Sequence, residues 1–277
     1  MDRIAILLST YNGELYLEEQ IDSIINQDYK NWDLYVRDDG SKDSTIEIIR
    51  NYSKQYDNIN FLEDDYNKGA ALSFMYLLHK VESDYYMFCD QDDVWLENKI
   101  SSVYNLLKKN TTEKNQPILI FSDAKVVDQN LKIIDNSFWK YNKTPPALML
   151  DCPDYISVFN CAPGCTMIFN KELKLSLYDN DDKLIMHDWY IMIKALKNGI
   201  VKYIDMPLML YRQHQSNVLG ASKISFKDRF SKFFNIKNSI NSQLEAFRFV
   251  RKYTNVNIFE YYKLKLKFNF LRFKINH

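Results

Sequence analysis

The chain has 277 residues, of which 46% are hydrophobic and 26% are charged, so it is long enough to bury a sizeable core in one large or two small domains. This composition excludes a disordered chain, and no run of about eighteen apolar residues is present that would cross a membrane. The formal net charge is zero, but the charges are unevenly distributed. The segment from Lys223 to His277 contains thirteen Lys and Arg and three acidic residues, and the remainder contains 23 Lys and Arg and 33 acidic residues. The body is therefore acidic and the tail basic, and we expect no nucleic-acid partner.

Four strand-like segments alternate with three helical patterns in the N-terminal half. The first segment, 4–8, is continuously apolar, which is typical of a strand buried on both faces of a parallel sheet. The amphipathic stripe after it consists of Leu17, Ile21, Ile24 and Ile25. Further strands are expected at 32–36, 59–62 and 85–89, with helices from 44 and over 70–80. This order predicts an α/β fold with a mostly parallel sheet flanked by helices.

Capping residues mark the start of the second helix. Asp43 or Ser44 is expected to be its N-cap, with Glu47 completing a capping box. A further helix is predicted directly after Trp95, with Leu96, Ile100, Val103 and Leu107 on one face.

The C-terminal half is less regular. We expect a strand at 118–121, a loop-rich segment opened by Lys143-Thr144-Pro145-Pro146, and strand-like sequence within 160–170. A helix follows from about 185 to 198, then two strands at 201–204 and 208–211, and basic helical sequence from 225 onward. Domain boundaries are predicted at 1–222 and 223–277.

The cysteines indicate a reducing compartment. Cys89, Cys152, Cys161 and Cys165 show no paired spacing, and no signal peptide precedes Ile4. No second pair of Cys or His residues stands near Cys161 and Cys165 at zinc-ligand spacing, so these two are expected to be ordinary buried thiols. The protein is expected to be cytoplasmic.

Each predicted strand of the N-terminal half ends in polar residues. The carboxyl ends of parallel strands meet at one edge of the sheet, where open α/β sheets bind ligands. The fourth strand ends in Asp90-Gln91-Asp92-Asp93, three carboxylates within four positions. Such a cluster raises the pKa of its members unless a cation holds them ionised, and a hard divalent ion bound to phosphate suits oxygen ligands. The six glycines form no phosphate-binding loop, which also favours neutralisation of phosphate by a metal.

With these residues in place, the chain resembles a family 2 glycosyltransferase of the GT-A fold, and within that family the rhamnosyltransferase-like members that build bacterial surface polysaccharides. The order and spacing of several short motifs between residue 4 and about 220 carry the resemblance. They are Ser9-Thr10-Tyr11-Asn12, Val36-Arg37-Asp38-Asp39-Gly40-Ser41, Asn67-Lys68-Gly69, Asp90-Gln91-Asp92-Asp93-Val94-Trp95, His187-Asp188-Trp189, and Tyr211-Arg212-Gln213-His214 with Asn217.

The resemblance implies a nucleotide site at the strand ends. Asp38 or Asp39 would accept a hydrogen bond from the base or ribose, although turn chemistry alone also explains Asp, Asn and Gly at such positions. The residues implied in nucleotide binding are Thr10, Tyr11, Asn12, Asp38, Asp39, Asn67, Gly69, Asp90 and Arg212.

The resemblance also implies a Mn²⁺ or Mg²⁺ cofactor at the family's D-x-D motif. Asp92 would coordinate the ion, Asp90 would face the ribose or a metal-bound water, and His214 would be a ligand of the metal or a donor to phosphate. Helix capping is the alternative explanation of these carboxylates, and Asp93 in particular is expected to be no more than a cap.

Asp188 matches the family's catalytic base, which takes the acceptor hydroxyl's proton in an inverting transfer. Its alternative role is a helix N-terminal carboxylate stabilised by the macrodipole. Trp189 is expected either to form a wall against the acceptor sugar or to be core. The residues implied in the pocket for the donor sugar and acceptor are Trp95, Gly164, Cys165, Thr166, His187 and Trp189, with Asn160 beside them.

The expected function is inverting, metal-dependent transfer of a sugar, foremost L-rhamnose from dTDP-rhamnose, to a lipid-linked oligosaccharide. A UDP-hexose donor, a non-catalytic sugar-nucleotide-binding subunit and a glycoside hydrolase are the alternatives. The basic tail has three expected uses: packing on the body, self-association as in a homodimer, or peripheral attachment to the inner face of the cell membrane.

Overall fold

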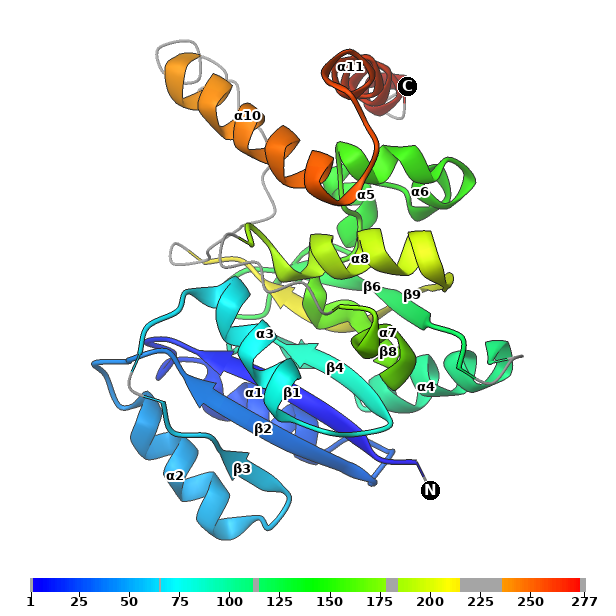
Figure 1. Ribbon diagram of the computed structural model, residues 1–277. Helices are drawn as coiled ribbons and strands as arrows, with labels where there is room; N and C mark the ends of the chain where they lie inside the picture. Colours follow the sequence, from blue (N-terminus) through cyan, green and yellow to red (C-terminus); the bar gives the residue numbers. More distant parts are fainter. Residues whose placement is uncertain (1, 65, 112–114, 178–183, 215–235, 275–277) are drawn as a thin grey trace.

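The alternation of strands and helices predicted for the N-terminal half is confirmed by the structure, a computed structural model that describes residues 2–64, 66–111, 115–177, 184–214 and 236–274. Figure 1 shows the arrangement of these elements. They are β1 (Ile4–Thr10), α1 (Leu17–Ile25), β2 (Trp32–Asp38), α2 (Thr45–Gln55), β3 (Ile59–Phe61), α3 (Ala70–Lys80) and β4 (Tyr85–Cys89).

The second half adds shorter elements before two long helices. In order they are β5 (Val94–Trp95), α4 (Lys99–Asn110), β6 (Ile118–Val127), β7 (Ile133–Asp135), α5 (Phe138–Asn142), α6 (Pro146–Asp151), the 3-10 turns η1 (Pro153–Ser157) and η2 (Gly164–Thr166), β8 (Met167–Asn170), α7 (Lys171–Leu175), α8 (His187–Asn198), β9 (Ile200–Arg212), α10 (Ile236–Tyr253) and α11 (Ile258–Lys274).

One sheet joins both halves, with the strand order β3-β2-β1-β4-β8-β6-β9-β5 and β7 paired to β6. β1, β2, β3 and β4 are mutually parallel, and β6 is parallel to β9. β8 is antiparallel to both β4 and β6, and β5 is antiparallel to β9. The predicted mostly parallel α/β sheet is therefore confirmed, with β5, β7 and β8 as its antiparallel members.

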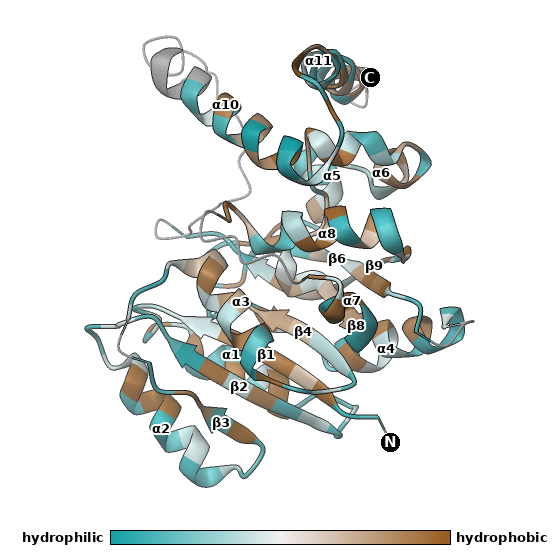
Figure 2. Ribbon diagram, viewed as in Figure 1, coloured by the Kyte–Doolittle hydropathy of each residue, from teal (hydrophilic) through white to brown (hydrophobic). Residues whose placement is uncertain are grey.

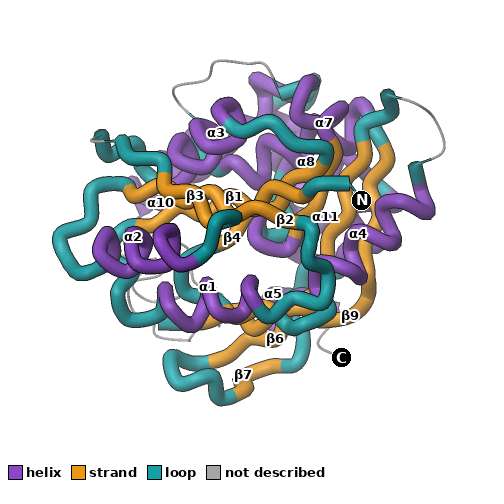
Figure 3. Tube along the Cα trace, turned by 90° about the horizontal axis from the view of Figure 1, so that it is seen from below, coloured by secondary structure: helices purple, strands orange, loops and turns teal. Residues whose placement is uncertain are grey.

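Alternate residues of the central strands supply two hydrophobic cores. Ile4, Ile6 and Leu8 point to the core shared with α1, α2 and α4, whereas Ala5 and Leu7 belong to the core under α3 and α8. Two-sided burial explains the continuous apolar run in β1. Figure 3 shows α3 and α8 on one side of the strands and α1 and α2 on the other, and Figure 2 shows the hydrophobic stretches along the central strands.

The segment after β4 differs from the prediction. The helix begins at Lys99 rather than at Leu96, and Asn98 is its N-cap. The residues between form the short strand β5, because the backbone of Val94 and Trp95 pairs with β9. Asp93 is not a helix cap; it is buried, and its carboxylate accepts a hydrogen bond from the backbone N–H of Arg212 at 3.0 Å.

Two further local predictions were confirmed only in part. Ser44 is the N-cap of α2 by position but accepts no capping hydrogen bond; the Asp43 carboxylate accepts from the Thr45 N–H at 3.1 Å instead. The two strands expected at 201–204 and 208–211 are one strand, β9, whose register against β6 shifts in the middle. A bulge at Asp205 and Met206 interrupts the apolar pattern without ending the strand.

The C-terminal region is helical, as predicted, and packs on the preceding part of the chain rather than standing apart. Tyr253 of α10 contacts Tyr190 of α8, with ring centroids 4.8 Å apart. Phe268 of α11 stacks on Phe159 with centroids 4.1 Å apart. The predicted boundary at 222/223 and the aromatic residues Phe226, Phe230, Phe233 and Phe234 lie outside the described residues.

Candidate active site

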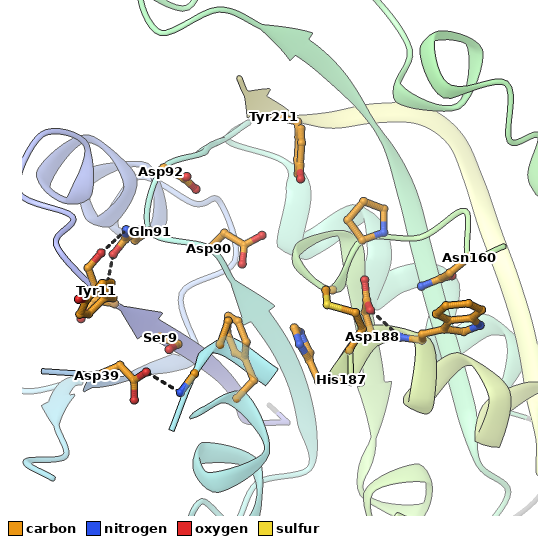
Figure 4. A pocket seen from close by; sticks show the side chains of 18 of the residues that line it. Ser9, Tyr11, Asp39, Asp90, Gln91, Asp92, Asn160, His187, Asp188 and Tyr211 are labelled. Carbon is orange, nitrogen blue, oxygen red and sulfur yellow. Dashed lines mark hydrogen bonds between the residues drawn. The ribbon is translucent and has the colours of Figure 1, made fainter. Parts of the chain in front are cut away.

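A cavity of about 710 Å³ opens where the polar ends of β1, β2 and β4 face the first turn of α8. Figure 4 shows Asp90 on one wall and Asp188 on the other, with His187 between them at the floor. The predicted site residues in its lining are Thr10, Tyr11, Asp39, Asn67, Gly69, Asp90, Asp92, Gly164, His187, Asp188 and Trp189. The fold thus collects these residues from six separate segments at one sheet edge.

Loops on one side of this cavity are hydrogen-bonded to one another. The Gln91 side chain accepts from the Tyr11 N–H at 2.8 Å and donates to the Tyr11 carbonyl at 3.0 Å, so it binds the first loop at both backbone groups. A Cβ on Gly13 would lie 2.4 Å from Gln91 Oε1, which explains the glycine. The aromatic ring of Tyr11 is left half exposed at the mouth of the cavity.

The adjacent aspartates Asp38 and Asp39 have different surroundings. The Asp39 carboxylate accepts from the backbone N–H groups of Lys68 and Gly69 at 2.7 and 2.8 Å, and it lies in the cavity lining. Asp38 instead accepts from the Thr10 hydroxyl at 2.9 Å and from the Ser41 hydroxyl and N–H at 2.5 and 2.7 Å. Asp38 therefore fixes the turn after β2, and Asp39 is the member of the pair that lines the cavity.

Carboxylates crowd the end of β4. Asp90 and Asp92 line the cavity, and Asp92 Oδ2 lies 2.7 Å from His214 Nε2. Oxygens of Asp90 and Asp93 and the Cys165 sulfur lie within 4.8 Å of one another. Asp93 Oδ2 is buried without a hydrogen-bond partner among the described residues.

Burial and mutual repulsion disfavour ionisation of this cluster. Burial, followed by the charge of Asp92, raises the pKa of Asp90, and the same causes raise the pKa of Asp93 well above its usual range. Lys99 lies near this cluster, is fully buried and donates to the Cys165 carbonyl at 2.6 Å. Burial lowers the pKa of Lys99, so it offsets the cluster only in part.

The donor set fits a hard divalent cation. Two carboxylates in the cavity wall, a third with an unpartnered buried oxygen and an imidazole beside Asp92 are ligands that Mg²⁺ and Mn²⁺ accept. An ion there would reverse the repulsion that raises the carboxylate pKa values. The Cys165 thiol lies beside Asp90 and Asp93, and without an ion burial raises its pKa well above the usual range.

Asp188 lies in the first turn of α8 and faces the cavity (Figure 4). Its Oδ1 accepts from the Trp189 N–H at 2.6 Å, which fixes the carboxylate at the helix N-terminus. Burial raises the pKa of Asp188 to about 6, although backbone hydrogen bonds from Trp189 and Gly164 oppose that shift. A carboxylate with this pKa is ionised at neutral pH and basic enough to accept a proton.

His187 is a second polar group on the cavity floor. Neither of its ring nitrogens has a hydrogen-bond partner among the described residues, and burial lowers its pKa to about 3, so the ring is neutral. The ring is held by Phe74 and Phe88, with centroids 4.3 and 4.8 Å away. A Cβ on Gly164 would lie 2.5 Å from His187 Nε2, which requires glycine there.

Seven predicted site residues lie outside the cavity lining. The Arg212 guanidinium donates to the carbonyls of Asp92 and Gln129 at 2.6 and 2.8 Å and pairs with Glu19, so it supports the loop behind the cavity. His214 contacts the cavity residue Asp92. The others are buried or engaged in turns: Asn12, Asp38, Trp95, Cys165 and Thr166. Asn217 lies outside the described residues.

Several lining residues had no recognisable signal in the sequence. Phe138 and Asn142 come from α5 in the segment expected to be loop-rich, and Met186 precedes the first turn of α8. None belongs to a motif or an amphipathic stripe. Phe138 and Asn142 reach the cavity because α5 packs beside β6, which tertiary contacts decide.

Residues 5–174 match the protein-family model described as glycosyl transferase family 2. The chain belongs to this family. The match covers Thr10, Asp39 and Asp90, and it ends before α8, so Asp188 lies beyond the matched residues.

Two similar curated family members carry names that specify a donor. The chain is 32% identical to the dTDP-rhamnosyl transferase RfbG of Shigella flexneri, over 83% of this chain and 79% of that protein. It is 25% identical to the UDP-Glc:alpha-D-GlcNAc-diphosphoundecaprenol beta-1,3-glucosyltransferase WfgD of Escherichia coli, over 78% of this chain and 79% of that one.

Solved structures agree on the fold. TarS 1–349 of S. aureus in complex with UDP-GlcNAc superposes with a TM-score of 0.59 at 18% identity, covering 78% of this chain and 60% of that one. The mannosyltransferase PcManGT from Pyrobaculum calidifontis, in complex with GDP-Man and Mn²⁺, gives 0.58 at 15% identity, covering 78% and 58%. The expected GT-A-like family 2 fold is thereby confirmed. None of the helices in the described residues combines the length and apolarity needed to cross a membrane.

Proposed function

We propose that this family 2 glycosyltransferase is an inverting, metal-dependent enzyme that transfers L-rhamnose from dTDP-rhamnose to a lipid-linked oligosaccharide at the cytoplasmic face of the cell membrane. The observation that carries the proposal is the division of one cavity into a wall of clustered carboxylates, Asp90 and Asp92, and a facing carboxylate, Asp188, that is basic enough to act alone.

In the proposed reaction Asp188 takes the proton of an acceptor hydroxyl as that oxygen bonds to the anomeric carbon of the sugar. The bond from the anomeric carbon to the diphosphate oxygen breaks on the opposite side, and a nucleoside diphosphate leaves. One base is sufficient for this single displacement, which inverts the anomeric configuration. The placement of Asp188 across the cavity from the carboxylate wall supports this role.

The chain's own residues would hold the donor at three points. Thr10, Tyr11 and Asp39 would frame the base and ribose, because they line the cavity at the ends of β1 and β2. Asp90 and Asp92, with His214 beside Asp92, would hold a Mn²⁺ or Mg²⁺ ion, which supplies Lewis-acid stabilisation of charge on the diphosphate. Neutral His187 would exchange hydrogen bonds with a sugar hydroxyl, which satisfies its buried nitrogens.

The donor is proposed from the higher similarity to the rhamnosyl transferase, and the runner-up is a UDP-hexose, which the similarity to the glucosyltransferase supports. Incubating the full chain with Mn²⁺ and a panel of dTDP- and UDP-sugars is expected to give the fastest release of nucleoside diphosphate from dTDP-rhamnose. Turnover of UDP-glucose or UDP-galactose alone would reject the rhamnose assignment. Release from none of them would reject the transferase proposal for this chain.

The rate of transfer is expected to fall about tenfold per pH unit below about pH 6. The sign follows from the base role: burial raises the pKa of Asp188 to about 6, so the carboxyl is protonated and inactive below that value and ionised above it. The kcat measured at saturating donor and metal should therefore rise from about pH 5 and level off above about pH 7. A flat profile across this range would contradict the assignment of Asp188.

A further inference from the structure

Helix α11 presents a stripe of apolar side chains to solvent on the face turned away from the body. Phe259 and Leu266 are 84% and 72% exposed, and Tyr262, Phe270 and Phe273 are exposed on the same face. These positions are three or four residues apart, so they line up along one side of the helix. We call Phe259, Tyr262, Leu266, Phe270 and Phe273 the α11 stripe; Figures 1 and 2 show the helix at the periphery of the molecule.

The opposite face fixes the helix to the catalytic half. Tyr261 and Phe268 are buried, and Phe268 stacks on Phe159 beside the cavity residue Asn160. Arg272 Nη2 donates to the carbonyl of Asn142 at 2.7 Å, and Asn142 also lines the cavity. The stripe is therefore the outer surface of an element that directly supports the rim of the site.

The charges around the stripe identify its partner. Helix α11 holds five basic residues against the single acid Glu260, and the exposed Lys263 and Lys267 run beside the stripe. The Glu260 carboxylate accepts from the Asn257 N–H at 3.0 Å at the helix start. If a second copy of α11 packed along the stripe, the lysines of the two helices would lie close together without acidic residues to pair with them. Anionic lipid headgroups, in contrast, would pair with these lysines while the aromatic residues insert between the lipids.

We propose that the α11 stripe is a membrane-docking surface, with its aromatic residues and Leu266 in the interface of an anionic bilayer and Lys263 and Lys267 against the headgroups. Docking in this orientation would hold the Asn142 and Asn160 rim of the cavity close to the bilayer, where a lipid-linked acceptor is anchored. This use of the surface rests on the proposed function, but the binding to the bilayer does not.

The test is vesicle flotation of the full chain with phosphatidylcholine vesicles, with and without about 30 mol% phosphatidylglycerol. The wild type is expected to float with the anionic vesicles and far less with the neutral ones. The variant F259A/L266A should partition at least about tenfold less, because two large apolar side chains no longer enter the interface. The variant K263Q/K267Q should lose about fivefold per lysine with anionic vesicles only.

The matched control is I133A/L175A, which removes two exposed apolar side chains from other surfaces and should float like the wild type. Equal flotation of F259A/L266A and the wild type, or no flotation of the wild type, would overturn the proposal. A dimeric wild type that becomes monomeric in F259A/L266A without any vesicle binding would assign the stripe to a second copy instead. Hydrolysis of the sugar nucleotide by the wild type is measured in parallel without vesicles. If the wild type does not hydrolyse the sugar nucleotide, the proposed function is rejected. If it hydrolyses the sugar nucleotide but does not float with vesicles, only the docking surface is rejected.

Discussion

Replacing Asp188 by Asn is expected to lower the kcat of sugar transfer by about 10²- to 10⁴-fold, because an amide of the same shape cannot accept the acceptor's proton. The fold should be retained, since the amide oxygen can still accept the 2.6 Å hydrogen bond from the Trp189 N–H. Donor binding should be nearly unchanged, because the residues proposed to hold the nucleotide and the ion lie on the opposite wall of the cavity.

Steady-state kinetics with isothermal titration of nucleoside diphosphate and Mn²⁺ would measure both expectations. The control is Asp205→Asn, the same chemical change at an exposed position of β9, which should leave kcat unaltered. If Asp188→Asn retained most of its turnover, another group would have to be the base. The shape of the pH profile would then fail together with this prediction, since both depend on one carboxyl.

Replacing Asp92 by Asn is expected to lower kcat by about 10²- to 10³-fold for a different reason, the loss of electrostatic stabilisation at the leaving group. Asp92 lies in the cavity wall and contacts His214, so its removal takes a carboxylate from the proposed ion site. The concentration of Mn²⁺ that gives half-maximal activity should rise, whereas in Asp188→Asn it should stay at the wild-type value.

The melting temperature, measured with and without Mn²⁺, distinguishes an ion-binding role of Asp92 from a purely structural one. The charge of Asp92 is among the causes that raise the pKa values of Asp90 and Asp93, so neutralising it relieves repulsion in the absence of metal. We expect the metal-free Asp92→Asn variant to melt at the same temperature as the wild type or higher, while Mn²⁺ stabilises it less. A variant that melts lower and retains the Mn²⁺ response would show that Asp92 mainly supports the fold.

Arg212 supports the loop that carries Asp92 and Asp93 instead of lining the cavity. Arg212 was expected at the phosphates, but its guanidinium binds the Asp92 carbonyl and Glu19, and its N–H donates to Asp93. The strand β9 therefore holds the carboxylate loop from behind. The expected helix cap at Asp93 was wrong because the chain forms β5 before turning into α4.

The sequence by itself determined the alternation of the first four strands and three helices, the edge of the sheet where ligands bind, and the carboxylate cluster at Asp90. These features depend on local periodicity and on the rule that parallel strands end at one edge, which need no knowledge of long-range contacts. The family resemblance added Asp188, and the structure places it in the same cavity.

Only the tertiary structure decided which member of each pair faces the cavity. Asp38 and Asp39 are adjacent in sequence, and a turn sends one to the backbone of its own loop and the other to the cavity. Cys165 and Gly164 are separated in the same way by a 3-10 turn. The residues that α5 adds to the cavity lining, and the face of α11 that is exposed, depend on packing between segments far apart in the chain. Local sequence patterns do not predict such contacts.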